Sequence, residues 1–295
     1  MNLTSPAAVS SLLRRHNFLP AHKLGQNFLV DANILAKIVA AGELQPGDSV
    51  LEIGTGLGVL TRALAEQVGP GGRVVTIERD RRLAPILAET VPSLDFPQVA
   101  FVEGDALDVS IPDVVRDLSR ADSARGIAVV ANIPYSITSP LLARLLESAL
   151  PFRVIVLLVQ REVCDRLAAS PGTSDYGAFS VFVQYYAEVE MVAAVSGTVF
   201  YPPPNVTSAI VRLRPRTAPI VTVTNTGRLF EIVQAAFQQR RKTLLNALSA
   251  DSLGWGKARA QVILAGAGID GMRRGETLSL EEFASIERTS ALEAH

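Results

Sequence analysis

Cysteine is nearly absent from this 295-residue sequence, which contains only Cys164. A single cysteine cannot form a disulfide within the chain, so a fold held together by internal disulfides is excluded. Cys164 stands among both apolar and charged residues, a setting more typical of a packing residue than of a nucleophile. The cysteine content therefore fits a protein of a reducing compartment.

Long hydrophobic runs are also missing. The longest strongly apolar run, Val154 to Val159, has the length of a buried strand and is far shorter than the ~20 residues of a membrane-spanning helix. Arg14, Arg15 and His16 follow only a short apolar stretch, so no export signal is visible. We expect a soluble, cytoplasmic protein with a sizeable core, since 48% of the residues are hydrophobic.

The chain carries little net charge, with a formal value of -1. The charge is distributed unevenly: residues up to Arg214 contain 18 Lys and Arg against 21 Asp and Glu, whereas the rest contains 10 against 8. Because a charge run is usually a solvated face, this asymmetry alone says little about nucleic acid. The composition also changes near Arg214, and we predict two domains, 1–214 and 215–295.

Apolar runs of strand length alternate with helical patterns between Asp48 and Val159, the rhythm of a parallel α/β sheet. The predicted strands are Ser49 to Ile53, Val74 to Ile77, Val99 to Val102, Ile127 to Ala131 and Val154 to Val159. Two further segments, Phe179 to Val189 and Ala209 to Leu213, are predicted as late strands, with antiparallel pairing to the sheet plausible.

The chain after Gly227 has helical patterns and predicts a small all-helical domain. The predicted helices are Leu229 to Gln239, Thr243 to Leu248, Lys257 to Ala265 and Glu281 to Glu287.

A glycine-rich turn follows the first strand of the sheet. It contains Gly54, Gly56 and Gly58 and leads into a helical pattern from Val59 to Val68. A dinucleotide-binding turn has its third glycine or alanine where this chain has Val59. The spacing therefore favours a nucleoside ligand without a pyrophosphate, although a tight turn without any ligand explains the glycines alone.

Carboxylates follow the next two strands, Glu78 at the end of one and Asp105 at the end of the other. Ligands of open α/β sheets bind at the carboxyl edge, where both acids are expected. A carboxylate can hold the two hydroxyls of a ribose, and a second can accept from an adenine amino group. S-adenosylmethionine explains the turn and both acids, with Glu78 on the ribose and Asp105 on the adenine.

The most specific motif comes after the fourth strand, as Asn132-Ile133-Pro134-Tyr135. An exocyclic adenine amine is a poor nucleophile because its lone pair is delocalised into the ring. The Asn132 side-chain oxygen and the Ile133 carbonyl can accept its two N–H bonds and direct the nitrogen at a methyl donor. Tyr135 offers a ring on which the base can stack. An isolated motif of this kind could equally be a turn with a core tyrosine.

The chain resembles a known family over nearly its whole length: the small-subunit ribosomal RNA adenine dimethyltransferases of the KsgA type. The matching stretches are Lys23 to Leu29, Gly54 to Gly58, Asn132 to Tyr135, Gln160 to Val163, Asp175 to Gly177, Phe200 to Pro204 and Gln239 to Leu244. The resemblance implies a Rossmann-like S-adenosylmethionine-dependent methyltransferase domain followed by a helical RNA-recognition domain. It implies N6,N6-dimethylation of two adjacent adenines in the 3′-terminal hairpin loop of 16S RNA.

The resemblance also implies roles for particular residues. Asn27 and Leu29 are expected at the cofactor's entrance with Gly54, Gly56, Glu78, Asp105 and Asn132. Phe200 is expected to face Tyr135 across the target base. The cluster Arg240, Arg241 and Lys242 is expected to bind RNA. The expected partner is a small ribosomal subunit under assembly, bound by a monomer without a metal or a membrane.

Three other functions remain open from the sequence. A macrolide-resistance type of enzyme would methylate adenine in large-subunit RNA, but the stretch from Gln239 to Leu244 argues against it. A ribosome-assembly factor could keep the fold without turnover, which the intact Asn132, Tyr135, Glu78 and Asp105 disfavour. A nicotinamide-dependent dehydrogenase is disfavoured by Val59.

Overall fold

A computed structural model of the chain describes residues 2–21, 24–118, 125–250 and 253–293. The chain packs into two compact units, one of Met1–Cys164 with Val189–Pro215 and one of Asp165–Glu188 with Arg216–His295. Both this division and the predicted one have a boundary near residue 215. They differ in residues 165–188, which pack with the second unit but were predicted as part of the first domain. The predicted domains, 1–214 for catalysis and 215–295 for RNA recognition, remain a prediction.

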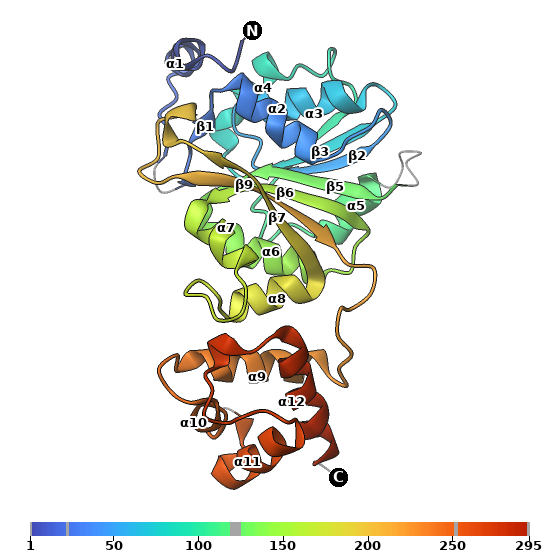
Figure 1. The fold of residues 1–295 in the computed structure, drawn as a ribbon. Coiled ribbons are helices and arrows are strands. Elements are labelled where there is room, and N and C mark those ends of the chain that lie inside the picture. Colours follow the sequence, from blue (N-terminus) through green and yellow to red (C-terminus); the bar gives the residue numbers. More distant parts are fainter. Residues whose placement is uncertain (1, 22–23, 119–124, 251–252, 294–295) are drawn as a thin grey trace. The chain divides into compact units, whose positions relative to one another are not determined.

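A seven-stranded sheet, in the order β4-β3-β2-β5-β6-β9-β7, forms the core of the first unit (Figure 1). Its strands are β2 (Ser49–Ile53), β3 (Arg73–Glu78), β4 (Val99–Glu103), β5 (Ile127–Asn132), β6 (Phe152–Gln160), β7 (Ala187–Val195) and β9 (Ser208–Pro215). The first five run parallel, and β9 runs antiparallel to β6. The five strands predicted between Ser49 and Val159 are confirmed, as is the antiparallel addition of residues 209–213.

The central strands are mostly apolar because helices cover both faces of the sheet. All five residues of β2 are buried. One face is covered by α2 (Ala32–Ala41), α3 (Val59–Val68) and α4 (Ala84–Thr90), and the other by α5 (Ile111–Leu118) and α6 (Thr138–Glu147) (Figure 1). This doubly wound sheet confirms the predicted Rossmann-like fold.

The N-terminal residues form a layer beside α4. Helix α1 (Pro6–Arg15) buries Val9, Leu12 and Leu13 in a cluster that includes Ile86 of α4. Strand β1 (Phe28–Leu29) pairs antiparallel with β8 (Phe200–Tyr201).

The predicted strand from Phe179 to Val189 is wrong over most of its length. Residues Ala178–Tyr186 form helix α8, preceded by α7 (Arg161–Ala168), and only the residues from Ala187 onward are a strand. The rings of Phe179 and Phe182 stack at 6.0 Å, and Phe182 lies 5.1 Å from Tyr186. These aromatic residues follow the three- and four-residue spacing of a helix face, whereas their high strand propensity suggested a strand.

The C-terminal part is helical, as predicted, with α9 (Thr226–Gln238), α10 (Leu244–Leu248), α11 (Gly256–Gly266) and α12 (Leu280–Leu292). These helices share an apolar core that contains Leu229, Ile263 and Phe283. The buried Glu287 accepts the backbone amides of Thr224 and Asn225 at 2.9 Å each, which joins α12 to the start of α9. Among the described residues, no helix is long and apolar enough to cross a membrane.

Candidate active site

Four parallel strands end at one edge of the sheet and bring the predicted residues together. Ile53 of β2 is paired with Ile77 of β3 and with Ala131 of β5, and Glu78 is paired with Glu103 of β4. The residues that follow these pairs therefore emerge side by side. The strand order changes direction at β2, and such a switch point is where open α/β sheets bind ligands.

The glycine turn is closed by contacts that leave no room for side chains. Gly54 has φ +82°, and a Cβ placed on it would lie 3.0 Å from the backbone oxygen of Asn132. Gly58 has φ +80°, and its Cβ would lie 2.5 Å from Val91. Both positions require glycine, because an L side chain is strained at these φ values and sterically excluded. The turn consequently brings β2 and β5 close together at the sheet edge.

Glu78 supports the turn from the neighbouring strand. Its Oε2 accepts the Gly56 amide at 3.0 Å, and its Oε1 accepts the Asp80 amide at 2.9 Å. Burial raises the pKa of Glu78, while the amides of Asp80 and Gly56 oppose that rise. The Arg79 amide also bonds to this carboxylate, and the acceptor capacity that remains is available to ribose hydroxyls.

Asp105 lies in the loop after β4, and both of its oxygens have partners. Oδ1 accepts the Leu107 amide at 2.9 Å, and Oδ2 is 2.9 Å from Nη1 of Arg79. The remaining lone pairs can accept from an adenine amino group. Arg79 was not predicted as a site residue, although it stands directly after Glu78 and lines the same pocket.

The reactive motif follows β5 and is covered by the segment that precedes β1. The Asn132 side-chain amide lies 3.5 Å from the Asn27 backbone oxygen, and the Asn27 side chain donates to the Gly25 oxygen at 3.2 Å. Gly25 lies so close to Pro134 that a Cβ there would be 3.0 Å from the proline side chain. Since the Asn132 nitrogen faces a carbonyl, its oxygen remains available as an acceptor.

Tyr135 begins a short 3-10 turn, Tyr135–Ile137, beside the pocket. Its hydroxyl lies 2.6 Å from that of Ser208, the first residue of β9. Burial raises the pKa of the Tyr135 phenol, and the bond to Ser208 lowers it in part. The ring is only partly buried, so one face can receive a ligand.

A chain of hydrogen bonds connects the N-terminal segment to Glu78. Gln26 accepts the Ala21 amide at 2.8 Å and donates to Asp80 at 2.7 Å, and the Asp80 amide donates to Glu78. The Arg82 guanidinium, which donates to the Asp80 carboxylate, holds the pKa of Asp80 below its usual range. Sequence reasoning missed Gln26 and Asp80, although Gln26 lies within a stretch that matches the family.

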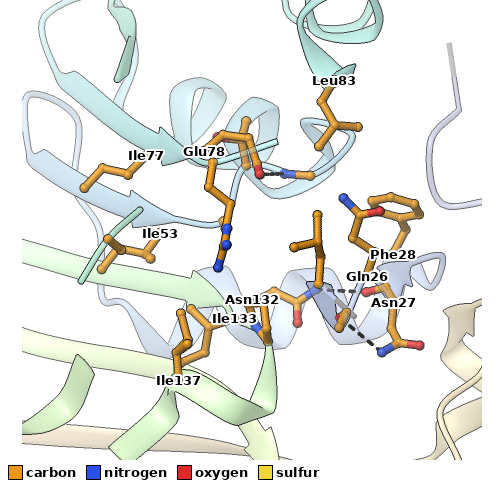
Figure 2. A pocket seen from close by; sticks show the side chains of 18 of the residues that line it. Gln26, Asn27, Phe28, Ile53, Ile77, Glu78, Leu83, Asn132, Ile133 and Ile137 are labelled. Carbon is orange, nitrogen blue, oxygen red and sulfur yellow. Dashed lines mark hydrogen bonds between the residues drawn. The ribbon is translucent and has the colours of Figure 1, made fainter. Parts of the chain in front are cut away.

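One pocket receives every residue that was predicted to bind the cofactor. Its lining includes Asn27, Leu29, Gly54, Gly56, Glu78, Asp105 and Asn132. Ile133 and Tyr135 line it as well. Figure 2 shows Asn27 and Asn132 close together, with Glu78 reaching the pocket from another strand. Apolar side chains of Ile53, Leu83 and Ile137 complete the wall, a setting that suits the flat adenine of S-adenosylmethionine.

Phe200 has a different place from the one expected. It is not part of the pocket lining and is only 3% exposed, buried in a core cluster with Leu29 and Ile34. Stacking of Phe200 on the target base remains a prediction, and it requires access to a ring that is covered here.

The basic cluster of the C-terminal unit divides into two kinds of side chain. The Arg240 guanidinium donates to the Ser174 oxygen at 2.8 Å and lies 3.4 Å from Glu276. Arg241 and Lys242 are exposed. Lys23, at the start of one matching stretch, lies outside the described residues.

A model of the family "Ribosomal RNA adenine dimethylase" matches residues 17–288 of the chain. The "Ribosomal RNA small subunit methyltransferase A" of Pelotomaculum thermopropionicum is 50% identical over 287 residues, 96% of either chain. The protein of the same name from Moorella thermoacetica is 49% identical over 290 residues, 98% of either chain.

Two solved structures resemble the chain closely enough to compare. A dimethyladenosine transferase from Plasmodium falciparum has a TM-score of 0.74 and 27% identity, covering 88% of this chain and 95% of that one. The 23S rRNA methyltransferase ErmE has a TM-score of 0.65 and 28% identity, covering 90% of this chain and all of that one.

Proposed function

The chain belongs to the ribosomal RNA adenine dimethylase family, and from this premise we propose that it dimethylates N6 of two adjacent adenines in 16S RNA. The target pair is in the 3′-terminal hairpin loop, and the methyl groups come from S-adenosylmethionine. The relatives named for the small subunit support this substrate, since they reach 50% identity over nearly full length. We place the reaction in the cytoplasm during small-subunit assembly, with the enzyme as a monomer.

One observation carries the proposal: a single pocket is lined by Glu78, Asp105 and Asn132, each of which follows a different strand. Glu78 suits a ribose, Asp105 suits the adenine of the cofactor, and the Asn132 amide suits the amine of a second adenine. These three side chains occur together where the strands end. A tight turn without ligand requires none of these three side chains. Their convergence therefore supports nucleoside-dependent chemistry on an amine.

The cofactor fits the residues at the sheet edge. Glu78 holds the ribose hydroxyls with the lone pairs left after it accepts the Gly56 and Asp80 amides. Asp105 accepts from the adenine amino group. Asn27 and Leu29 close the entrance. When bound, the cofactor supplies an electrophilic methyl group on sulfonium, and the protein supplies position and electrostatics.

Asn132 and Ile133 prepare the target nitrogen. The Asn132 side-chain oxygen and the Ile133 carbonyl accept the two N6–H bonds, which draws the lone pair out of conjugation and directs it at the methyl group. Tyr135 stacks on the extruded base and offsets part of the cost of unstacking it. As the bond between N6 and the methyl carbon forms, the bond between that carbon and the cofactor's sulfur would break, leaving a neutral thioether, and the methylated nitrogen would release its proton to solvent. A second round uses the remaining N–H.

The C-terminal unit holds the RNA backbone in this proposal. Arg241 and Lys242 present exposed charges to phosphates, as a solvent-facing cation can. Arg240 belongs to the same predicted cluster and its side chain is 51% exposed, but its guanidinium already contacts the Ser174 oxygen and Glu276. We therefore assign the larger share of phosphate binding to Arg241 and Lys242.

The other candidate functions have less support. The similarity to ErmE, a 23S rRNA methyltransferase, is 28% identity, well below the identity to proteins named for the small subunit. An assembly factor without turnover has no need for the Asn132 amide beside a cofactor pocket. A nicotinamide-dependent enzyme has no support in the family match.

Methyl transfer with purified components tests the proposal. Small subunits from cells without this modification are incubated with the protein and isotopically labelled S-adenosylmethionine, and the 16S RNA fragments are mapped by mass spectrometry. We expect two methyl groups on each of two adjacent adenines near the 3′ end. Label in 23S RNA only, or no label, would contradict the proposal. Thermal stabilisation by S-adenosylmethionine and not by NAD checks the cofactor separately.

A further inference from the structure

The reactive motif makes one contact for which the proposed chemistry gives no reason. The hydroxyl of Tyr135 lies 2.6 Å from the hydroxyl of Ser208, although the two residues are 73 positions apart. Stacking on a base requires only an aromatic ring, and a phenylalanine would provide it. The hydroxyl pair therefore needs another explanation.

Ser208 is a rigid support for such a contact. It has no exposed surface, and its Cα is paired with that of Gln160 at the end of β6. The Arg161 amide donates to the Thr207 oxygen at 3.0 Å, so the backbone is also fixed just before Ser208. A serine held in this way can fix whatever binds its hydroxyl.

Tyr135 is the less restrained partner. Its ring is partly exposed and lines the pocket, and its backbone belongs to a turn in which the Ile137 amide donates to the Pro134 oxygen at 3.1 Å. Rotation about the bond between Cα and Cβ of a tyrosine has three staggered minima, which point the ring in different directions. A hydrogen bond at the far end of the ring therefore fixes where the ring lies, and it also favours one ring plane because the phenol O–H prefers to lie in that plane.

We propose that Ser208 is a positioning residue for methyl transfer: through its hydrogen bond it fixes the position of the Tyr135 ring, so that the ring presents one face to the target adenine. This inference rests on the proposed function, because the stacked base is the substrate. Ser208 acts through Tyr135 and not through contact with the adenine. Correct placement of a reacting group affects rate more than affinity for the particle, which many remote contacts determine.

A double-mutant cycle with Ser208→Ala and Tyr135→Phe tests this inference, since both changes remove the same bond and the second keeps the ring. Single-turnover methylation of unmodified small subunits is measured for the wild type, both single variants and the double variant. Each single change should lower the rate about 5- to 10-fold, in line with the loss of one hydrogen bond, and the double variant should be no slower. The KM for particles should stay near the wild-type value. Ser208→Thr, which keeps a hydroxyl, should retain most of the rate.

The outcomes separate this inference from the proposed function. A wild-type protein that transfers no methyl group to the particles contradicts the proposed function itself. An active wild type whose Ser208→Ala variant keeps the full rate contradicts only the role of Ser208. Rate losses that multiply in the double variant show that the Tyr135 hydroxyl acts independently of Ser208, which also overturns the inference. Melting temperatures of all variants serve as controls for loss of stability. A fall in rate that Ser208→Thr does not rescue would indicate a purely structural effect and would contradict the inference.

Discussion

The sheet edge of the first unit and the basic cluster of the second differ in how their side chains are held. At the sheet edge, backbone amides at 2.9–3.0 Å hold Glu78, and neighbouring chain segments cover Asn132. In the basic cluster all three residues are exposed, and Arg240 differs from Arg241 and Lys242 in that it binds a backbone oxygen within its own unit. The comparison suggests that chemistry depends on fixed groups and RNA binding on freely solvated ones. The same residue type can therefore have different roles at adjacent positions.

The largest effect is expected for Asn132→Ala. The lost acceptor serves the transition state more than the ground state, so turnover should fall by ~10² to 10³, as for other preorganised polar groups. Single-turnover kinetics measures the fall, and calorimetry should show S-adenosylmethionine binding close to that of the wild type. Methylation at the wild-type rate would remove Asn132 from the mechanism.

Glu78→Ala should act on the cofactor and not on the chemical step. Loss of hydrogen bonds to a charged group costs about 1.5–3 kcal/mol, so affinity for S-adenosylmethionine should fall roughly 10- to 100-fold. The rate at saturating cofactor should recover in large part. Titration calorimetry of this variant and of Glu78→Gln provides the test, and unchanged binding in both would place the ribose elsewhere.

A buried acid below the sheet edge should make stability depend on pH. Glu52 of β2 is fully buried, and burial raises its pKa to about 8, while Thr61 and Thr76 oppose the rise. In the unfolded chain the carboxyl ionises near its ordinary value of 4.5. Between pH 4.5 and about 8, Glu52 is therefore protonated in the folded state and ionised in the unfolded state. The stability that the neutral Glu52 provides is lost as the pH rises toward 8.

Glu52→Gln removes this titration. The free energy of unfolding of the wild type, compared with that of the variant, should decline by about 1.4 kcal/mol per pH unit within this window. Any constant offset between the two proteins is irrelevant, because the slope is the observable. Urea unfolding at pH 5.5, 6.5 and 7.5 measures it, and parallel curves would show that Glu52 titrates normally.

The smallest effect, and the sharpest test of the comparison, concerns the basic cluster. Replacing Arg241 and Lys242 together by Ala should flatten the plot of log affinity for small subunits against log salt, by roughly 0.7 to 0.9 per lost phosphate contact. Melting temperature should hardly change. Arg240→Ala, the matched control, should lower the melting temperature and leave most of the slope. The reverse pattern would mean that Arg240 binds RNA.

The strands and the pocket were predictable from sequence because local chemistry determines them. A buried parallel strand such as β6 contains a continuous apolar run, Val154 to Val159, and a turn with Gly54 at positive φ tolerates little else. Acids placed directly after strands must then emerge at the sheet edge. The same reasoning failed for residues 179–186, where aromatic residues with high strand propensity occupy one face of a helix.

The remaining contacts depend on distances that no sequence pattern encodes. The pairing of Arg79 with Asp105, and that of Tyr135 with Ser208, joins residues brought together only by the packed sheet. Arg240 and Arg241 are the same residue type at adjacent positions, and the contacts of Arg240 with the Ser174 oxygen and Glu276 distinguish them. The burial of Phe200 likewise follows from the pairing of β1 with β8.

Mass mapping of 16S RNA from cells with and without this gene tests the central claim most directly. With the gene, two adjacent adenines of the 3′-terminal hairpin loop should each carry two methyl groups on N6. Without it, both should be unmodified, and the intact gene should restore them where one encoding Asn132→Ala does not. Dimethylated adenines at full occupancy in cells lacking the gene would contradict the account.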